Sequence, residues 1–214
     1  MTDAISNTTG PRTAAGKRNA QAGFTLIELM LSTLILLVVA SAVFKLLSEI
    51  QHRASYQAEE QAVLNNTRIA MRVVEQYIRQ AGNDPLNSGL TGVNIVSAKE
   101  VQIRSDLKGS LGTGNPNKGD PDGDTDDSGE NVTIRYNKVS RSLEIIPDGG
   151  PAQIVASHIA DLSMQYYNAE GGVADSGNDV RKIAVTISGS TLRPHPETHR
   201  IFGLKLSTSI RILT

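Results

Sequence analysis

Hydrophobic and polar positions divide the chain into three parts. Residues 1–23 are polar, rich in Ser, Thr, Asn and Ala, and a long apolar run follows them. From Phe24 to Phe44 the only ionisable side chain is Glu28. About 20 apolar residues in a helix cross the roughly 30 Å hydrocarbon core of a bilayer. The pattern therefore predicts a membrane-spanning helical segment over residues 24–45, with a single carboxylate near its start.

The helical pattern continues beyond this run as an amphipathic stretch, residues 46–81. Its apolar positions recur at the spacing of one helix face: Ala70, Val74, Tyr77 and Ala81, flanked by Ile69, Val73 and Ile78. Gly82 and Pro85 are helix stop signals. We expect one helix from residue 24 to about residue 81. The alternative is two helices joined by a hinge within residues 45–51.

Residues 82–214 predict a β-rich globular headpiece. Short, β-branched and partly alternating stretches are separated there by clusters of Gly, Asp, Asn and Pro. The alternation is clearest in KLSTSIRI, which predicts one strand face with Leu206, Thr208, Ile210 and Ile212. We expect these strands to form an antiparallel sheet packed on the amphipathic half of the helix. This arrangement is an α+β fold.

The residues before the apolar run suggest how the segment is oriented and processed. Arg12, Lys17 and Arg18 stand there against one Asp3, which favours an N-terminus in the cytoplasm. The run fits a plain anchor, a secretory signal cut near residues 40–42, or a segment cut before the run. Only the last accounts for Glu28, because an ionisable residue in a membrane span is by default functional and needs a partner. Cutting before the run would create that partner, a new amine one helical turn away.

The stretch GFTLIELMLSTLILLV resembles the prepilin signal of type IV pilins and type II secretion pseudopilins. The resemblance implies that a prepilin peptidase cuts after Gly23 and N-methylates the new first residue, Phe24. It also places Glu28 fifth in the mature chain, where the family's glutamate meets the N-terminal amine of a neighbouring subunit. Pairing the buried carboxylate with an amine relieves the cost of burying it. We therefore expect a cleaved leader over residues 1–23 and an assembly role for Glu28.

The headpiece resembles that of PilW-type minor pilins, through MQYYN, VRKIAVTIS and the closing LSTSIRI. The resemblance implies a minor pilin that takes part in pilus assembly or initiation. It would be made as an inner-membrane precursor with a periplasmic headpiece, would associate with major and minor pilins through the N-terminal helix, and would end in the pilus or at its tip. No proline occurs between Phe24 and Asp84, whereas major pilins often carry one. A J-type pseudopilin of type II secretion is the alternative.

Composition and motifs argue against other functional classes. The formal net charge of −1 gives no indication of nucleic-acid binding, and the absence of cysteine excludes disulfides and thiol catalysis. We find no phosphate loop, nucleophile elbow or paired catalytic carboxylates, so we do not expect an enzyme. A single-pass membrane enzyme or sensor is the alternative of another class. His195 and His199 have the spacing of a zinc-binding helix, but the prolines beside His195 oppose a helix.

One acidic stretch, NKGDPDGDTDDSGEN, is the only candidate metal site. Carboxylates at alternating loop positions can converge on Ca²⁺, which prefers hard oxygen ligands. The candidates are Asp120, Asp122, Asp124 and Asp126. The stretch departs from the EF-hand pattern, since Thr125 stands at the glycine position and Asn131 at that of the closing glutamate. Calcium is therefore a possible cofactor, and a solvated acidic loop is the alternative.

Overall fold

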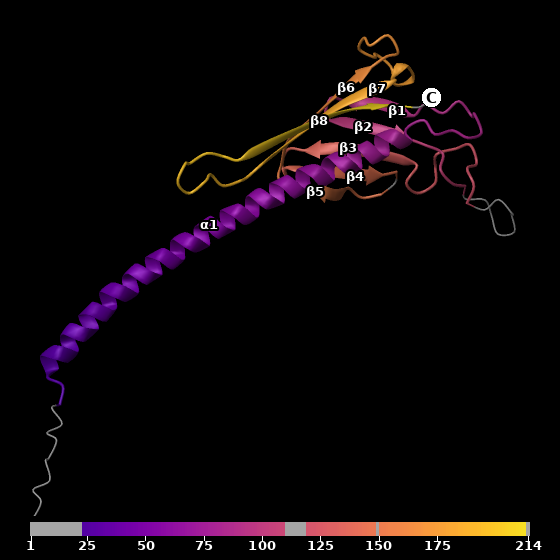
Figure 1. Ribbon diagram of the computed structural model, residues 1–214. Helices are drawn as coiled ribbons and strands as arrows, with labels where there is room; N and C mark the ends of the chain where they lie inside the picture. The colour runs from indigo at the N-terminus through magenta and orange to yellow at the C-terminus, as the bar shows by residue number, and fades with distance from the viewer. Residues whose placement is uncertain (1–22, 110–118, 149, 213–214) are drawn as a thin grey trace, which may run out of the picture. The chain divides into compact units, whose positions relative to one another are not determined.

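A computed structural model of the chain describes residues 23–109, 119–148 and 150–212 (Figure 1). The chain divides into two compact units, Met1–Ser48 and Glu49–Thr214. Each unit is described by itself below. Of the leader expected over residues 1–23, residues 1–22 lie outside the described residues.

One helix, α1 (Leu26–Gln80), contributes to both units. It has 55 residues without a break, so the alternative of a hinge within residues 45–51 is wrong. Its buried residues all fall within the second unit: Tyr56, Val63, Thr67, Ala70, Met71, Val74 and Ile78. Because 3.6 residues make one turn, these positions form a single stripe. The expected stripe was correct for Ala70, Val74 and Ile78, but Ile69 lies outside it and is 45% exposed.

Two antiparallel sheets make up the rest of the second unit, where we had expected one. The first has strand order β1-β2-β3-β4-β5: β1 (Val93–Ser97), β2 (Glu100–Arg104), β3 (Asn131–Asn137), β4 (Ser142–Pro147) and β5 (Gln153–Ala156). The second has order β6-β7-β8: β6 (Ile159–Tyr167), β7 (Lys182–Ser190) and β8 (Gly203–Arg211). A short 3₁₀ helix, η1 (Gly177–Asp179), precedes β7. The expected α+β class is confirmed.

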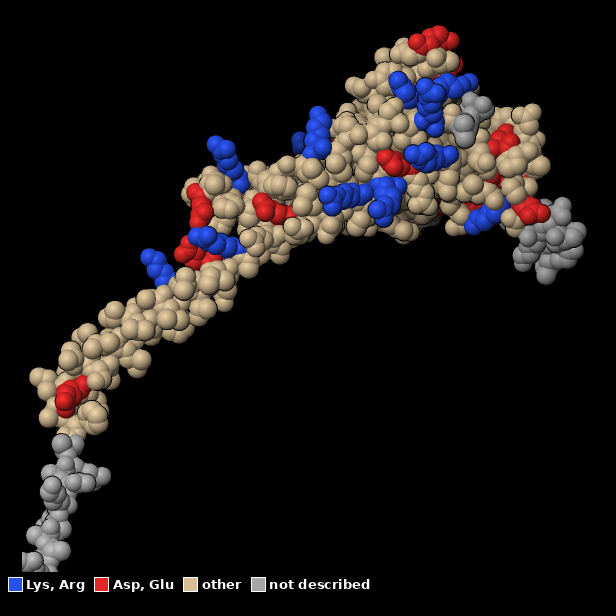
Figure 2. Space-filling model, viewed as in Figure 1, with Lys and Arg blue, Asp and Glu red and all other residues tan. Residues whose placement is uncertain are grey.

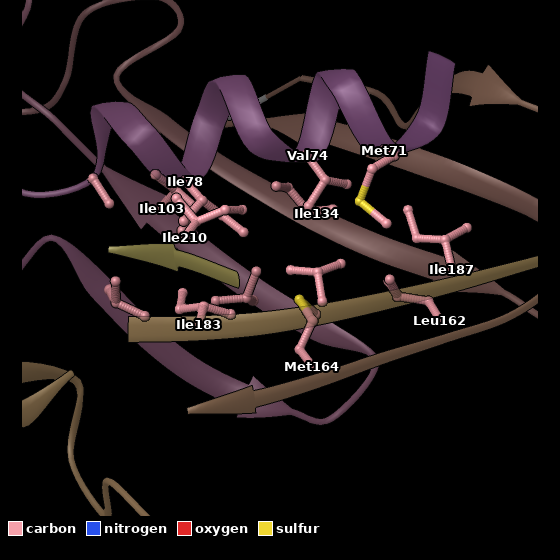
Figure 3. Packing of buried hydrophobic residues seen from close by; sticks show 14 of the residues in the cluster. Met71, Val74, Ile78, Ile103, Ile134, Leu162, Met164, Ile183, Ile187 and Ile210 are labelled. Carbon is pink, nitrogen blue, oxygen red and sulfur yellow. The ribbon is translucent and has the colours of Figure 1, made fainter. Parts of the chain in front are cut away.

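The core lies where the buried stripe of α1 meets the inner faces of both sheets. Figure 3 shows Met71, Val74 and Ile78 of α1 above apolar side chains from both sheets: Ile103, Ile134, Leu162, Met164, Ile183, Ile187 and Ile210. Buried and less buried positions alternate along β3 and β7, as expected for strands with one covered face. In β8 the predicted inner face is confirmed, since Ile210 is buried and Leu206 packs against the core.

Gly189 of β7 allows the helix to approach the second sheet closely. A Cβ atom at this position would lie 2.1 Å from Oγ1 of Thr67 and 3.0 Å from Cγ1 of Val63. Thr67 is fully buried, and its hydroxyl donates to the carbonyl of Val63 at 2.7 Å. The absent side chain of Gly189 therefore lets the backbone of β7 lie against α1.

Hydrogen bonds from two tyrosines and one backbone amide join the two sheets along β6. The hydroxyl of Tyr136 donates to the carbonyl of Ala160 at 2.7 Å, and that of Tyr166 to the carbonyl of Ser97 at 3.0 Å. The backbone N–H of Met164 donates to the carbonyl of Ala98 at 2.8 Å. These bonds give the N–H of Met164 and the carbonyls of Ser97, Ala98 and Ala160 partners across the two sheets.

The β7–β8 connection, residues 191–202, holds the hairpin to α1. A carboxylate oxygen of Glu59 accepts hydrogen bonds from the backbone N–H groups of Leu192 and Arg193. The ring of His195 meets that of Tyr56 edge-on, with centroids 4.9 Å apart. The hairpin end is thus attached to the helix by an aromatic contact and by hydrogen bonds to the charged carboxylate of Glu59.

Glu144 of β4 should make the stability of the second unit sensitive to acid. It is 5% exposed and its carboxylate accepts from Nη2 of Arg135 at 2.7 Å and Nδ2 of Asn137 at 2.8 Å. The hydrogen bond from Arg135, followed by that from Asn137, holds the pKa of Glu144 below its ordinary value of 4.5. Because the folded state has the lower pKa, this stabilisation is complete above about pH 4.5 and is lost as the pH falls through the folded value.

We expect Glu144→Gln to lower the free energy of unfolding by about 1–2 kcal/mol at pH 7, because a charge-assisted hydrogen bond is replaced by a neutral one. The difference between variant and wild type should shrink toward zero as the pH is lowered. Thermal unfolding followed over a pH series measures it. A constant difference at every pH would contradict an ionic origin.

Candidate functional site

The start of α1 carries the residues that the sequence assigns to processing and assembly. Gly23 and Phe24 precede the helix, and the side chain of Phe24 is 86% exposed. No atom lies within 4 Å of the place where a Cβ of Gly23 would stand, apart from its chain neighbours. Among the described residues, nothing therefore obstructs the Gly23–Phe24 peptide bond.

Thr25 and Glu28 form a capping box at the first turn of α1. Oγ1 of Thr25 accepts a hydrogen bond from the N–H of Glu28 at 3.3 Å. In return, Oε2 of Glu28 accepts from the N–H of Thr25 at 3.0 Å and from its hydroxyl at 3.1 Å. The box satisfies two backbone donors that a helix start leaves unpaired, and a carboxylate there is favoured by the helix dipole.

The capping role of Thr25 was missed in the sequence, although the signal is visible. Thr-x-x-Glu before an apolar run is the pattern of a capping box. Both hydrogen bonds to the carboxylate go to Oε2, so Oε1 of Glu28 has no partner among the described residues. The capping box therefore leaves one carboxylate oxygen available to a cation.

The hydroxyl groups of Ser32, Thr33 and Ser41 in the apolar segment donate hydrogen bonds to backbone carbonyls of the same helix. Ser32 donates to the carbonyl of Glu28 at 2.7 Å, Thr33 to that of Met30 at 2.9 Å, and Ser41 to that of Val38 at 2.7 Å. Such bonds allow hydroxyls to lie in an apolar environment. Among the polar side chains of residues 24–44 that the structure describes, Glu28 alone carries a charge that needs an external partner.

The apolar part of α1 has no cover within its own unit. All residues of 23–39 are exposed, including Leu34, Ile35 and Leu37 at 58%, 55% and 70%. In Figure 2 this part of the helix is free of Lys and Arg and carries one acidic patch near its start. Within the part of the chain that the structure describes, α1 is the one helix long and apolar enough to cross a membrane. An apolar surface of this extent requires lipid or other helices.

The acidic loop is held by hydrogen bonds between backbone N–H groups and buried carboxylates. Two buried carboxylates outside the predicted set organise it: Asp106 accepts from the N–H of Gly123 at 2.9 Å, and Glu130 accepts from that of Leu107 at 2.7 Å. Neither was singled out as a structural residue, because their partners are far from them in sequence.

The four candidate ligands do not converge in the structure. Asp120, Asp124 and Asp126 are exposed and Asp122 is half-buried. Across residues 23–109, 119–148 and 150–212, no three His, Asp or Glu side chains are grouped so as to hold a metal ion. A hydrogen bond shared with Asp124, followed by the repulsion of its charge, raises the pKa of Asp126. Calcium binding by this loop stays a prediction.

Calcium is tested by melting the full chain in detergent with calcium or with chelator. If Asp120, Asp122 and Asp124 bind Ca²⁺, the second unit should gain about 2.7 kcal/mol at a hundredfold excess over the dissociation constant. Asp122→Asn should remove most of that gain, whereas Asp148→Asn, outside the loop, should leave it intact. An unchanged melting curve at millimolar calcium would leave the loop as acidic surface.

The two histidines with zinc-like spacing lie in the β7–β8 connection and not on a helix. Nδ1 of His195 accepts from the backbone N–H groups of Glu197 and Thr198 at 3.1 and 3.2 Å. His199 has a positive φ of 53° and its N–H donates to the carbonyl of His195 at 2.9 Å. His195 thus shapes the turn, and both histidines lie in a loop, as the prolines beside His195 indicated.

Comparison with known proteins places one motif on this chain. The family model of the prokaryotic N-terminal methylation motif matches residues 18–44. A search of the curated proteins found no match. The matched residues include Gly23, Phe24, the capping box and most of the exposed apolar segment. Such a motif implies processing by a prepilin peptidase and association with other pilins. Together with the long N-terminal helix packed on antiparallel sheets, it supports a protein of the type IV pilin-like superfamily, which includes the pseudopilins.

Proposed function

We propose that this chain is a minor pilin of a type IV pilus. It is made as an inner-membrane precursor, cut after Gly23, N-methylated on Phe24, and then joins or primes a filament. The observation that carries the proposal is the methylation motif over residues 18–44, set on a helix whose apolar surface is exposed and contains one carboxylate. A plain membrane anchor would need neither the motif nor Glu28.

The assembly step follows from the chemistry of the first helical turn. Extraction of the helix from lipid into a bundle of similar helices keeps its apolar surface covered. Glu28 destabilises the helix both in lipid and in the bundle unless its charge is paired. An unpaired carboxylate is unfavourable in a surrounding of low dielectric constant. The free amine produced at Phe24 supplies that pair, within the subunit or from a neighbour. The carboxylate therefore acts as a registry device for helix packing.

The headpiece would be periplasmic in the precursor and would lie at the filament surface or tip after assembly. Residues Arg12, Lys17 and Arg18 before the span favour a cytoplasmic N-terminus, which places the remainder across the membrane. The expected partners are the prepilin peptidase, major and minor pilins, and the inner membrane. The N-terminal methylation motif favours a structural role over an enzymatic one. The fold, in which one helix packs on two sheets, is consistent with that role.

Mass spectrometry of the protein isolated from cells tests the proposal. We expect a mature chain that begins with N-methylated Phe24. A Gly23→Val variant, which alters the residue before the cut, should remain at full length. A chain that begins at Met1 in wild-type cells, or near residue 43, would contradict the proposal and favour an anchored enzyme or sensor, or a secreted protein.

A J-type pseudopilin of type II secretion remains the second candidate, since the methylation motif is shared by both classes. The resemblance of MQYYN, VRKIAVTIS and LSTSIRI to PilW-type minor pilins favours the pilus. The genes next to this one distinguish the two. Other minor pilins there would support the pilus, whereas a run of secretion pseudopilins would reverse the choice.

A further inference from the structure

A basic pocket lies at one end of the three-stranded sheet. Its cavity of about 370 Å³ is lined by three cationic residues, one amide and small or apolar neighbours: Arg181, Lys182, Arg211, Asn168, Ala169, Gly171 and Ile212. Of the residues that the structure describes, no acidic one lines it. Figure 2 shows Lys and Arg side chains gathered close to where the C label marks the end of the chain in Figure 1. The pocket therefore carries a concentrated positive charge.

Strand register brings two of these cations directly opposite each other. Lys182 of β7 and Arg211 of β8 are cross-strand partners. Like charges at such positions are destabilising. The ion pairs of the described residues involve Arg53, Lys99 and Arg135 as cations, so none compensates the pocket. Nζ of Lys182 lies 4.4 Å from the ring centroid of Tyr167, which holds its position without neutralising its charge.

The side chains at the rim present hydrogen-bond donors. Nη1 of Arg181 donates to the carbonyls of Asn178 and Val180 at 2.7 and 3.1 Å, which orients its guanidinium. Oδ1 of Asn168 accepts from the N–H of Gly172 at 2.7 Å. Its Nδ2 group then has no partner among the described residues and remains a donor. A pocket with several donors, and with no carboxylate among its described lining residues, fits an anion.

We propose that this pocket binds a phosphate group. Three cations exceed what one carboxylate would neutralise, whereas a phosphate carries about −1.5 to −2 charges and three strong acceptor oxygens. Arginine matches phosphate through its planar fork, and lysine adds a point charge. The group is either a free phosphate or one unit of a phosphate-bearing polymer. This inference does not depend on the filament role, because it rests on the headpiece alone.

The test uses the full chain in detergent at constant ionic strength, because salt screens exposed charges over about 10 Å at 0.1 M. Calorimetric titration with inorganic phosphate should show saturable binding, and thermal unfolding should shift upward with phosphate. Acetate at the same ionic strength should do neither. Linear polyphosphate distinguishes the sources: equal affinity per phosphate indicates a free ion, and much tighter binding indicates a polymer. Both results support a phosphate site.

Two variants and a matched control locate the binding. Lys182→Gln and Arg211→Gln should each weaken phosphate binding about fivefold to tenfold, and the double variant should abolish it. Without phosphate, each should melt at the wild-type temperature or slightly above, since a like-charge contact is removed. Lys205→Gln, on the same exposed side of β8 but opposite Ser188, should change binding less than about twofold. Absence of saturable binding, an equal response to acetate, or an equal loss in Lys205→Gln would overturn the proposal.

Discussion

Replacing Glu28 by alanine should leave the chain in the membrane and cut after Gly23, yet keep it out of filaments. Insertion should be no worse, because a carboxylate is removed from the span. Entry into the filament should fail, because removing one member of a low-dielectric charge pair leaves the other uncompensated at about 3–5 kcal/mol. Filaments sheared from cells and the membranes left behind are both probed for the protein.

The capping box requires a control for this experiment, since Glu28→Ala also removes hydrogen bonds to Thr25. Loss of a helix cap costs about 0.5–2 kcal/mol. Thr25→Val removes the capping hydroxyl but keeps the carboxylate, and it should still enter filaments. Glu28→Gln should fail like alanine, while Glu28→Asp should be milder. If Glu28→Ala is incorporated like the wild type, or if Thr25→Val fails equally, the charge-pairing role is wrong.

Ile78→Ala should destabilise the second unit by about 2–5 kcal/mol. Ile78 is fully buried at the contact of α1 with both sheets, and its truncation leaves a cavity that the surrounding side chains cannot fill completely (Figure 3). Thermal unfolding of the full chain in detergent measures the loss. The near-ultraviolet signal of the five tyrosines reports it, since the chain has no tryptophan.

Ile69→Ala is the matched control for that change. It makes the same substitution in the same helix, at a side chain that is 45% exposed. We expect a change within about 0.5 kcal/mol, because partial exposure lowers the cost and alanine favours the helix. An equal loss in both variants would mean that the burial stripe of α1 is placed incorrectly.

Linear patterns were sufficient to predict a processing site and the helix that follows it. Gly23, Phe24 and Glu28 stand out by order and spacing alone, and the methylation motif over residues 18–44 includes all three. The long helix followed from an apolar run and a 3.6-residue period, which are local properties of the chain. The β content and the inner face of β8 followed from alternation in the same way. The capping role of Thr25 was also visible as a local Thr-x-x-Glu pattern, but it was missed.

Long-range contacts decided the rest, because they join residues whose proximity no local pattern encodes. Whether the strands form one sheet or two depends on which strand edges pair, and only the tertiary structure shows that β1–β5 form one sheet and β6–β8 another. The acidic loop is organised by Asp106, which lies 17 positions from its partner Gly123. The basic pocket exists because register sets Lys182 opposite Arg211, 29 positions later in the chain. The sequence determined the local elements and the side chains that each element carries. Tertiary packing determined which side chains from distant parts of the chain come into contact.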